Sequence, residues 1–137
     1  MVKKTDREII HQIDAEFASL IKNLKDLARS VPSENLVRSA AAIEQMCGGL
    51  TANLWDDPFE WTLPETLSNP DLVIEYLDEV DLARQRTFSS MDDAALTKLI
   101  SVPSGESRVL ISLLLETLVR ASELHGRAQN ALLSSPT

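Results

Sequence analysis

Few side chains in this chain could carry out acid–base, nucleophilic or metal chemistry. Its 137 residues include two histidines, His11 and His125, and one cysteine, Cys47. Near neutral pH an imidazole can transfer a proton or bind a metal ion, and a thiolate can act as a nucleophile or as a soft metal ligand. These three residues therefore limit which of these chemistries the chain can support.

His125 differs from His11 in where helical periodicity places it. Steps of three and four residues along the last helical segment connect His125 with a stripe of apolar residues, namely Leu114, Leu118, Ala121, Ala128 and Leu132. A hydrogen-bonded core histidine is the usual interpretation of such a position, and a metal ligand or an acid–base group is the alternative. His11 lies one turn from Asp14 on the flank of its segment, which indicates a plain surface residue.

The second helical segment supplies the residues that could meet His125. Its apolar positions recur in alternating steps of four and three, a spacing typical of helices that pack in bundles: Leu36, Ala40, Ile43, Cys47, Leu50 and Leu54. On this seam a small buried thiol is a more common interpretation of Cys47 than a nucleophile. Glu44 and Gln45 are its polar neighbours. Because a tight zinc site needs at least three convergent ligands, we expect no stoichiometric metal, with His125 as the sole candidate ligand.

Periodic apolar residues and helix breakers define the elements that would position these side chains. They predict long helices over 6–28, 33–54, 70–88 and 106–133 and one short helix over 94–100. Asn69-Pro70-Asp71 is a strong helix start, and Val102-Pro103-Ser104-Gly105 ends the short helix. The chain is therefore expected to be all-α, a single domain over 1–137 in which the main helices form a four-helix bundle.

The connection over 55–69 is unusually apolar for a loop, and it contains both tryptophans, Trp55 and Trp61. Leaving both rings in water would forgo several kcal/mol of burial. We therefore expect at least one to be mostly buried in a lid on one end of the bundle; a pocket lining or a dimer interface is the alternative. Gly48 and Gly49 precede this connection, and each costs a helix about 1 kcal/mol relative to alanine. They indicate a close helix contact or a kink, or else room for a ligand.

Composition and charge narrow the class of protein. A hydrophobic content of 44% excludes a largely disordered chain, and a single cysteine excludes an internal disulfide and a cysteine-rich zinc site. The net charge of −8 makes nucleic acid and anionic membranes unexpected partners. We expect neither a signal peptide nor a membrane span, and the lone thiol fits a cytoplasmic protein. Ten acidic residues and no Lys or Arg lie between Ser39 and Ala83, which indicates a solvated acidic face or else a surface for a basic partner or a weakly bound cation.

Two stretches carry a resemblance to a known family. The segment LETLVRASELHGRAQ over 115–129, together with WDDPFEW over 55–61 and the order of the elements, resembles the DinB/YfiT-like helical bundles. That resemblance implies a divalent metal held by three histidines, one on the second helix and two in a His-x-x-x-His step on the last. Some family members look like thiol-cofactor-dependent transferases. If His125 matches the second histidine of the step, the first falls on Ala121, and the second helix has no histidine. The resemblance thus implies the fold with a degenerate metal site.

These observations together predict a DinB-like bundle that acts as a non-catalytic binding or interaction protein. We expect no cofactor, and we expect a homodimer that forms through bundle helices; a small-molecule ligand is an open alternative. The rival hypothesis is a metal- or thiol-cofactor-dependent transferase or hydrolase that uses His125. The residues expected to line a shared pocket are His125, Cys47, Glu44, Gln45, Ala121, Trp55 and Trp61.

Overall fold

Four long helices make up most of the computed structural model, which describes residues 4–30, 34–62 and 64–134. They are α1 (Glu8–Ala28), α2 (Glu34–Ala52), α4 (Pro70–Ser89) and α5 (Leu110–Ser134). The short elements are α3 (Pro64–Leu67), the 3-10 helices η1 (Lys4–Arg7), η2 (Pro58–Trp61) and η3 (Asp93–Thr97), and the strands β1 (Leu99–Ser101) and β2 (Ser107–Val109). The mainly helical prediction is therefore confirmed. Within the described ranges, no helix is both long and apolar enough to cross a membrane.

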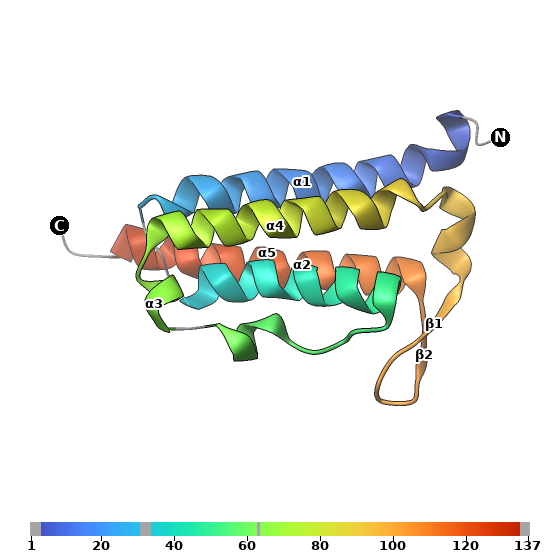
Figure 1. The fold of residues 1–137 in the computed structure, drawn as a ribbon. Helices are drawn as coiled ribbons and strands as arrows, with labels where there is room; N and C mark the ends of the chain where they lie inside the picture. Colours follow the sequence, from blue (N-terminus) through green and yellow to red (C-terminus); the bar gives the residue numbers. More distant parts are fainter. Residues whose placement is uncertain (1–3, 31–33, 63, 135–137) are drawn as a thin grey trace.

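The long helices lie side by side, with α1 next to α4 and α2 next to α5 (Figure 1). The segment over 53–69 returns along the length of the molecule before α4 begins, so α2 and α4 run in the same direction (Figure 1). Asn69 starts α4 as predicted, because its side-chain oxygen accepts hydrogen bonds from the N–H groups of Asp71 and Leu72.

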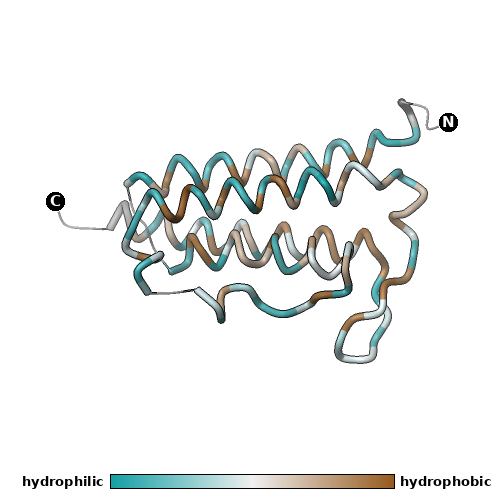
Figure 2. The backbone as a smooth tube through the Cα atoms, viewed as in Figure 1, coloured by the Kyte–Doolittle hydropathy of each residue, from teal (hydrophilic) through white to brown (hydrophobic). Residues whose placement is uncertain are grey.

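All four long helices contribute to one apolar core. Hydrophilic and hydrophobic residues alternate around each of them (Figure 2), as amphipathic helices require. Phe17 of α1 and Phe88 of α4 are fully buried, with ring centroids 5.7 Å apart and a tilted arrangement. Ile43 of α2 and Leu114 of α5 are both 0% exposed and complete the core from the other side. Each such side chain contributes roughly 1.5–3 kcal/mol by leaving water.

The region between α4 and α5 differs from the prediction. The expected helix over 94–100 is a 3-10 helix over Asp93–Thr97, and the next residues form β1. β1 pairs with β2 in antiparallel register, with Leu99 opposite Val109. The last long helix therefore begins at Leu110 and not at 106. Gly105 has a φ of 88° in the turn of this hairpin, a conformation that glycine adopts at little cost.

Residues of η1 and η3, which flank α1 and α4, cap the end of the other long helix. The Asp93 carboxylate accepts hydrogen bonds from the N–H groups of Ile9 and Ile10, at 3.2 and 2.9 Å, at the start of α1. The Arg7 guanidinium donates to the carbonyl oxygens of Phe88 and Met91, at 2.9 and 3.0 Å, at the end of α4. Each charge has the sign that favours the helix end it contacts. The helices expected from residues 6 and 33 begin at Glu8 and Glu34, and Ser33 lies outside the described residues.

Candidate functional site

His125 lies at the seam between α5 and α1, away from α2. It is partly buried, and this burial lowers the pKa of its imidazole. It lines a shallow hollow of about 380 Å³ together with Asn23, Asp26, Leu27, Ser30 and Gln129. Asp26, which was not among the candidate residues, is the acidic residue in this lining.

Ala121 closes the contact between α5 and α2. It is fully buried, and its carbonyl oxygen accepts a hydrogen bond of 2.6 Å from the hydroxyl of Ser39, which is itself buried. The helix face on which the resemblance places a first histidine is thus in direct contact with α2. His125, about one turn further along α5, faces α1.

Cys47 is buried between α2 and α4, where Thr87 is its hydrogen-bonding neighbour. Burial raises the pKa of the thiol, and the hydrogen bond with Thr87 opposes this effect without overcoming it. A thiol of this kind stays protonated at neutral pH, and only the thiolate is an effective nucleophile. The geometry agrees with the interpretation of Cys47 as a small buried apolar residue.

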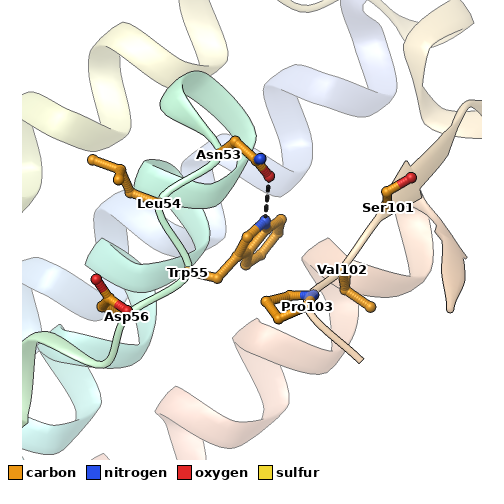
Figure 3. Close-up of a pocket in the computed structure, with 7 residues that line it drawn as sticks. All are labelled: Asn53, Leu54, Trp55, Asp56, Ser101, Val102 and Pro103. Atoms are coloured by element: carbon orange, nitrogen blue, oxygen red, sulfur yellow. Dashed lines mark hydrogen bonds between the residues drawn. The ribbon is translucent and has the colours of Figure 1, made fainter. Parts of the chain in front are cut away.

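Gln45 and Trp55 form a structural unit at the end of α2. The Gln45 side-chain amide donates to the carbonyl oxygen of Trp55 at 2.7 Å, and the indole N–H of Trp55 donates to Asn53 at 3.0 Å (Figure 3). A Cβ atom on Gly49 would lie 2.3 Å from Cε3 of this indole. Gly49 is thus required by the close approach of the Trp55 ring, which corresponds to the close contact that the glycine pair predicts.

Trp55 also borders a hollow of about 500 Å³ between the end of α2 and the β-hairpin. Figure 3 shows its ring facing Val102 and Pro103 from the hairpin loop. Asn53 has a φ of 56°, and its N–H donates to the Gly49 carbonyl oxygen, as is typical of a left-handed helix cap. Trp55 is only partly exposed, so it anchors the crossover against the bundle as expected of the lid.

Glu44 and Trp61 meet at a different hollow, between the crossover and α4. This hollow has a volume of about 420 Å³ and is lined by Glu44, Pro58, Trp61, Thr62, Thr66, Leu72, Glu75, Tyr76 and Glu79. Trp61 is 77% exposed, so of the two tryptophans Trp55 is the one that the fold partly buries. Three carboxylates and no Lys or Arg are among the described residues of the lining.

A hydrogen bond from the Tyr76 hydroxyl to Glu44 forms the floor of this hollow. Burial raises the pKa of Tyr76 most strongly, and the hydrogen bond with Glu44 and the negative charge of that carboxylate raise it further. The phenol therefore stays protonated at neutral pH and keeps donating its hydrogen bond to Glu44. Glu44 is held in one orientation beside Glu75 and Glu79, which are exposed on successive turns of α4.

The residues expected to line one pocket are divided among five places. His125 lies against α1, Ala121 and Cys47 lie in separate helix contacts, Gln45 and Trp55 lie at the end of α2, and Glu44 and Trp61 lie at the acidic hollow. In the described part of the chain, no group of three or more His, Cys, Asp or Glu side chains is placed to hold a metal ion.

The sequence indicated Glu75 and Glu79 only as part of the broad acidic segment, and it indicated no site for Tyr76. The available signal was the spacing of Glu75 and Glu79, which lie one helical turn apart within the segment that has no Lys or Arg. The crossover loop adds Trp61 to these residues, and nothing in the helical pattern indicates which helix a loop of this length packs against.

Comparisons with family models, with curated proteins and with solved structures find no match for this chain.

Proposed function

We propose that this chain is a DinB-like four-helix bundle that acts as a non-catalytic binding protein, and that it binds a cationic group at the hollow between the crossover and α4. The support for the bundle is the set of four long helices around one core, with a long crossover between α2 and α4. The single observation that carries the binding function is the exposed indole of Trp61 beside the carboxylates of Glu44, Glu75 and Glu79. We call these four residues and Tyr76 the acidic hollow.

The chemistry of the acidic hollow selects a positive charge. An indole face attracts an ammonium or guanidinium group, with about 0.5–1 kcal/mol at an exposed site. Glu75 and Glu79 carry like charges one turn apart on α4, an arrangement that costs a helix a few tenths of a kcal/mol when nothing neutralises it. A bound cation removes that repulsion. The proposed ligand is a Lys or Arg side chain in a basic segment of a partner protein.

Preorganisation favours the same conclusion. Tyr76 holds Glu44 through a hydrogen bond, so this carboxylate does not lose freedom when a ligand binds. Trp61 lies at the end of η2, whose first turn is capped by the Asp57 carboxylate accepting from the Phe59 N–H at 3.0 Å. The two sides of the hollow are thus built from capped or hydrogen-bonded segments.

The rival hypothesis, an enzyme that uses His125, has less geometric support. Neither Glu44 nor Cys47 lines the hollow of His125, which leaves Asp26 as the acidic neighbour. Metal analysis of protein purified without tag or chelator tests this rival directly. Near-equimolar zinc, nickel or iron that disappears in His125→Ala would make the enzyme hypothesis the better one.

A peptide titration tests the proposed binding function. An oligoarginine peptide should bind and change the fluorescence of Trp61, whereas an oligoglutamate peptide of the same length should not. Glu79→Gln and Trp61→Ala should each weaken binding by about two- to five-fold, the range expected for one exposed charge pair or one cation–π contact.

The matched control is Glu106→Gln, which removes one exposed negative charge near the hairpin, outside the acidic hollow. It should leave the affinity for oligoarginine almost unchanged. If Glu106→Gln and Glu79→Gln weaken binding equally, attraction to the overall negative charge explains the binding, and the acidic hollow is not the site.

A further inference from the structure

A basic hollow lies between the start of α2 and the middle of α5, although the net charge of the chain is −8. The two helices lie next to each other and run in opposite directions (Figure 1), which brings the first turns of α2 beside this part of α5. The hollow has a volume of about 360 Å³ and is lined by Asn35, Arg38, Arg120, Glu123, Leu124 and Arg127. We call these six residues the arginine hollow.

Two contacts hold the guanidinium group of Arg38 in place before any ligand binds. Its Nε and Nη2 atoms donate to the same carboxylate oxygen of Glu34, at 3.2 and 2.8 Å. Its Cζ atom lies 4.1 Å from the ring centroid of Phe59, which belongs to the crossover. A guanidinium group has five N–H donors and the ion pair uses two of them, so three remain for a ligand. A group that is already held in place loses little freedom when it binds.

Arg120 and Arg127 are exposed on α5, three residues before and four residues after Glu123. Side chains at these spacings share a helix face and can form ion pairs. Within the described parts of the chain, however, neither arginine forms an ion pair with Glu123 or with any other acidic group. Both guanidinium groups therefore keep their charge available to a ligand in the hollow.

The chemistry of the arginine hollow selects an anion with more than one charge. Its lining has three arginines and one glutamate, so its net charge is positive even though Glu34 offsets part of the charge of Arg38 from outside the lining. A phosphate monoester carries a charge of about −1.5 to −2 at neutral pH, and guanidinium groups can bind its oxygens in pairs. A carboxylate or a phosphodiester carries one negative charge, so the same lining attracts it about half as strongly. Asn35 lies in the first turn of α2, where the helix dipole also favours an anion.

The size of the arginine hollow and the charge of the whole chain favour a small ligand. Pockets for small molecules have volumes of about 300–1,000 Å³, and this hollow lies near the lower end of that range. The net negative charge of the chain repels large polyanions, whereas the neighbouring guanidinium groups dominate within a Debye length of about 8 Å. Leu124 is only 9% exposed and gives the hollow an apolar floor for the organic part of a ligand.

We propose that the arginine hollow binds the phosphate group of a small-molecule phosphate monoester, with Arg38, Arg120 and Arg127 donating to its oxygens. This proposal is independent of the acidic hollow, which lies between the crossover and α4. It gives a chemical class and a place to the small-molecule ligand that the sequence left as an alternative.

A titration of the full chain with phenyl phosphate, followed by ¹H–¹⁵N NMR at constant ionic strength, tests the site. The largest chemical shift changes should occur in Asn35, Arg38 and the residues around Glu123. Benzoate and methyl phenyl phosphate have the same ring but one negative charge, and each should bind about three-fold or more weakly. Equal affinity for phenyl phosphate and methyl phenyl phosphate, or shift changes confined to another part of the chain, would overturn the proposal.

Inorganic phosphate separates the two sources of a doubly charged phosphate. It should bind in the same hollow more weakly than phenyl phosphate, because it has no organic part to contact Leu124. If inorganic phosphate binds as tightly as phenyl phosphate or more tightly, the hollow is a site for the free ion, and the assignment to a monoester is wrong.

Substitutions in the lining should change the affinity in opposite directions. Arg120→Gln and Arg127→Gln should each weaken the binding of phenyl phosphate by about two- to five-fold, the range for one exposed charge pair. Glu123→Gln should strengthen it by a similar factor, because the lining loses its negative charge. All three positions are exposed, so the variants should keep the fold, which circular dichroism verifies.

The matched controls are Arg86→Gln on α4 and Glu106→Gln near the hairpin, which change the same exposed charges outside the arginine hollow. Both should leave the affinity for phenyl phosphate almost unchanged. If Arg86→Gln weakens binding as much as Arg127→Gln, or if Glu123→Gln fails to strengthen it, the charges of the hollow do not hold the ligand and the proposal is refuted.

Discussion

The only tyrosine of the chain provides a test of the acidic hollow that requires no ligand. Tyr76 donates a hydrogen bond to Glu44, and burial together with that carboxylate raises its pKa above the ordinary value. In the unfolded chain a tyrosine ionises near pH 10. Between pH 10 and the higher pKa of the folded state, the unfolded protein has released a proton that the folded protein keeps. The contribution of Tyr76 to stability is therefore complete below pH 10 and is lost as the pH rises above it.

Tyr76→Phe gives this effect a magnitude. The variant loses a hydrogen bond to a charged acceptor, which contributes about 1.5–3 kcal/mol when buried, and the lower end applies because Glu44 borders an open hollow. Above pH 10 the wild type loses about 1.4 kcal/mol for each pH unit through this group, and the variant does not. The free energies of unfolding of the two proteins should therefore converge at about pH 11 and cross above it.

Urea unfolding followed by far-UV circular dichroism, at a series of pH values from neutral to alkaline, measures both curves. The tyrosinate absorbance of the folded wild type should stay absent until the protein unfolds. Comparing the two proteins removes the contribution of lysines and of Cys47, which are common to both. A tyrosinate signal with a midpoint near pH 10 in folded protein, or a stability difference that stays constant with pH, would refute the assigned hydrogen bond.

Three further substitutions and one labelling reaction test the packing. Asp93→Ala should destabilise the protein by about 1–2 kcal/mol in urea unfolding, because the start of α1 loses its carboxylate cap; an unchanged midpoint would contradict this. Gly49→Ala should destabilise the protein by about 1–3 kcal/mol and red-shift the tryptophan emission, because the added Cβ displaces the Trp55 ring. Gly126→Ala should not destabilise the folded chain, because its Cβ meets open space. Cys47 should resist alkylation by iodoacetamide at neutral pH until urea unfolds the chain, because burial raises the pKa of its thiol; rapid labelling of folded protein would contradict the buried assignment.

The long helices could be predicted because each repeats its apolar spacing over about five turns and is bounded by a strong breaker. The Asn69-Pro70 start of α4 is the clearest case, since the asparagine caps the helix and the proline lacks the N–H that would otherwise be unpaired there. The predicted positions of the helix ends are less accurate. The start of α1 depends on Asp93, which is more than eighty residues away in sequence and carries no local signal.

The β-hairpin could not be predicted from local pattern. Its strands have three residues each, too few for an alternation of period two to be distinguished from a helical spacing. Leu99 and Ile100 fit the helical spacing that begins at Ala94, so they were assigned to a helix. The pairing of Leu99 with Val109 is decided by the turn at Gly105 and by tertiary packing.

The candidate residues do not lie together in a single pocket for a related reason. Helical periodicity places His125 and Cys47 on inward-facing sides, but it does not say which neighbouring helix each side meets. His125 faces α1, and Cys47 faces Thr87 of α4. The crossover decides which helices are neighbours around the core, and a loop has no periodic pattern from which its path could be predicted.

Gly49 and Gly126 show what additional information the structure supplies about a single residue type. Both lie inside helices, and propensity alone assigns both the same cost. The structure places an indole ring where the side chain of the first would lie, and it leaves the position of the second open. The first glycine therefore serves the fold of one chain, and replacing it should lower the stability of that chain. The second has no such contact, so replacing it with alanine should leave the stability of the folded chain unlowered.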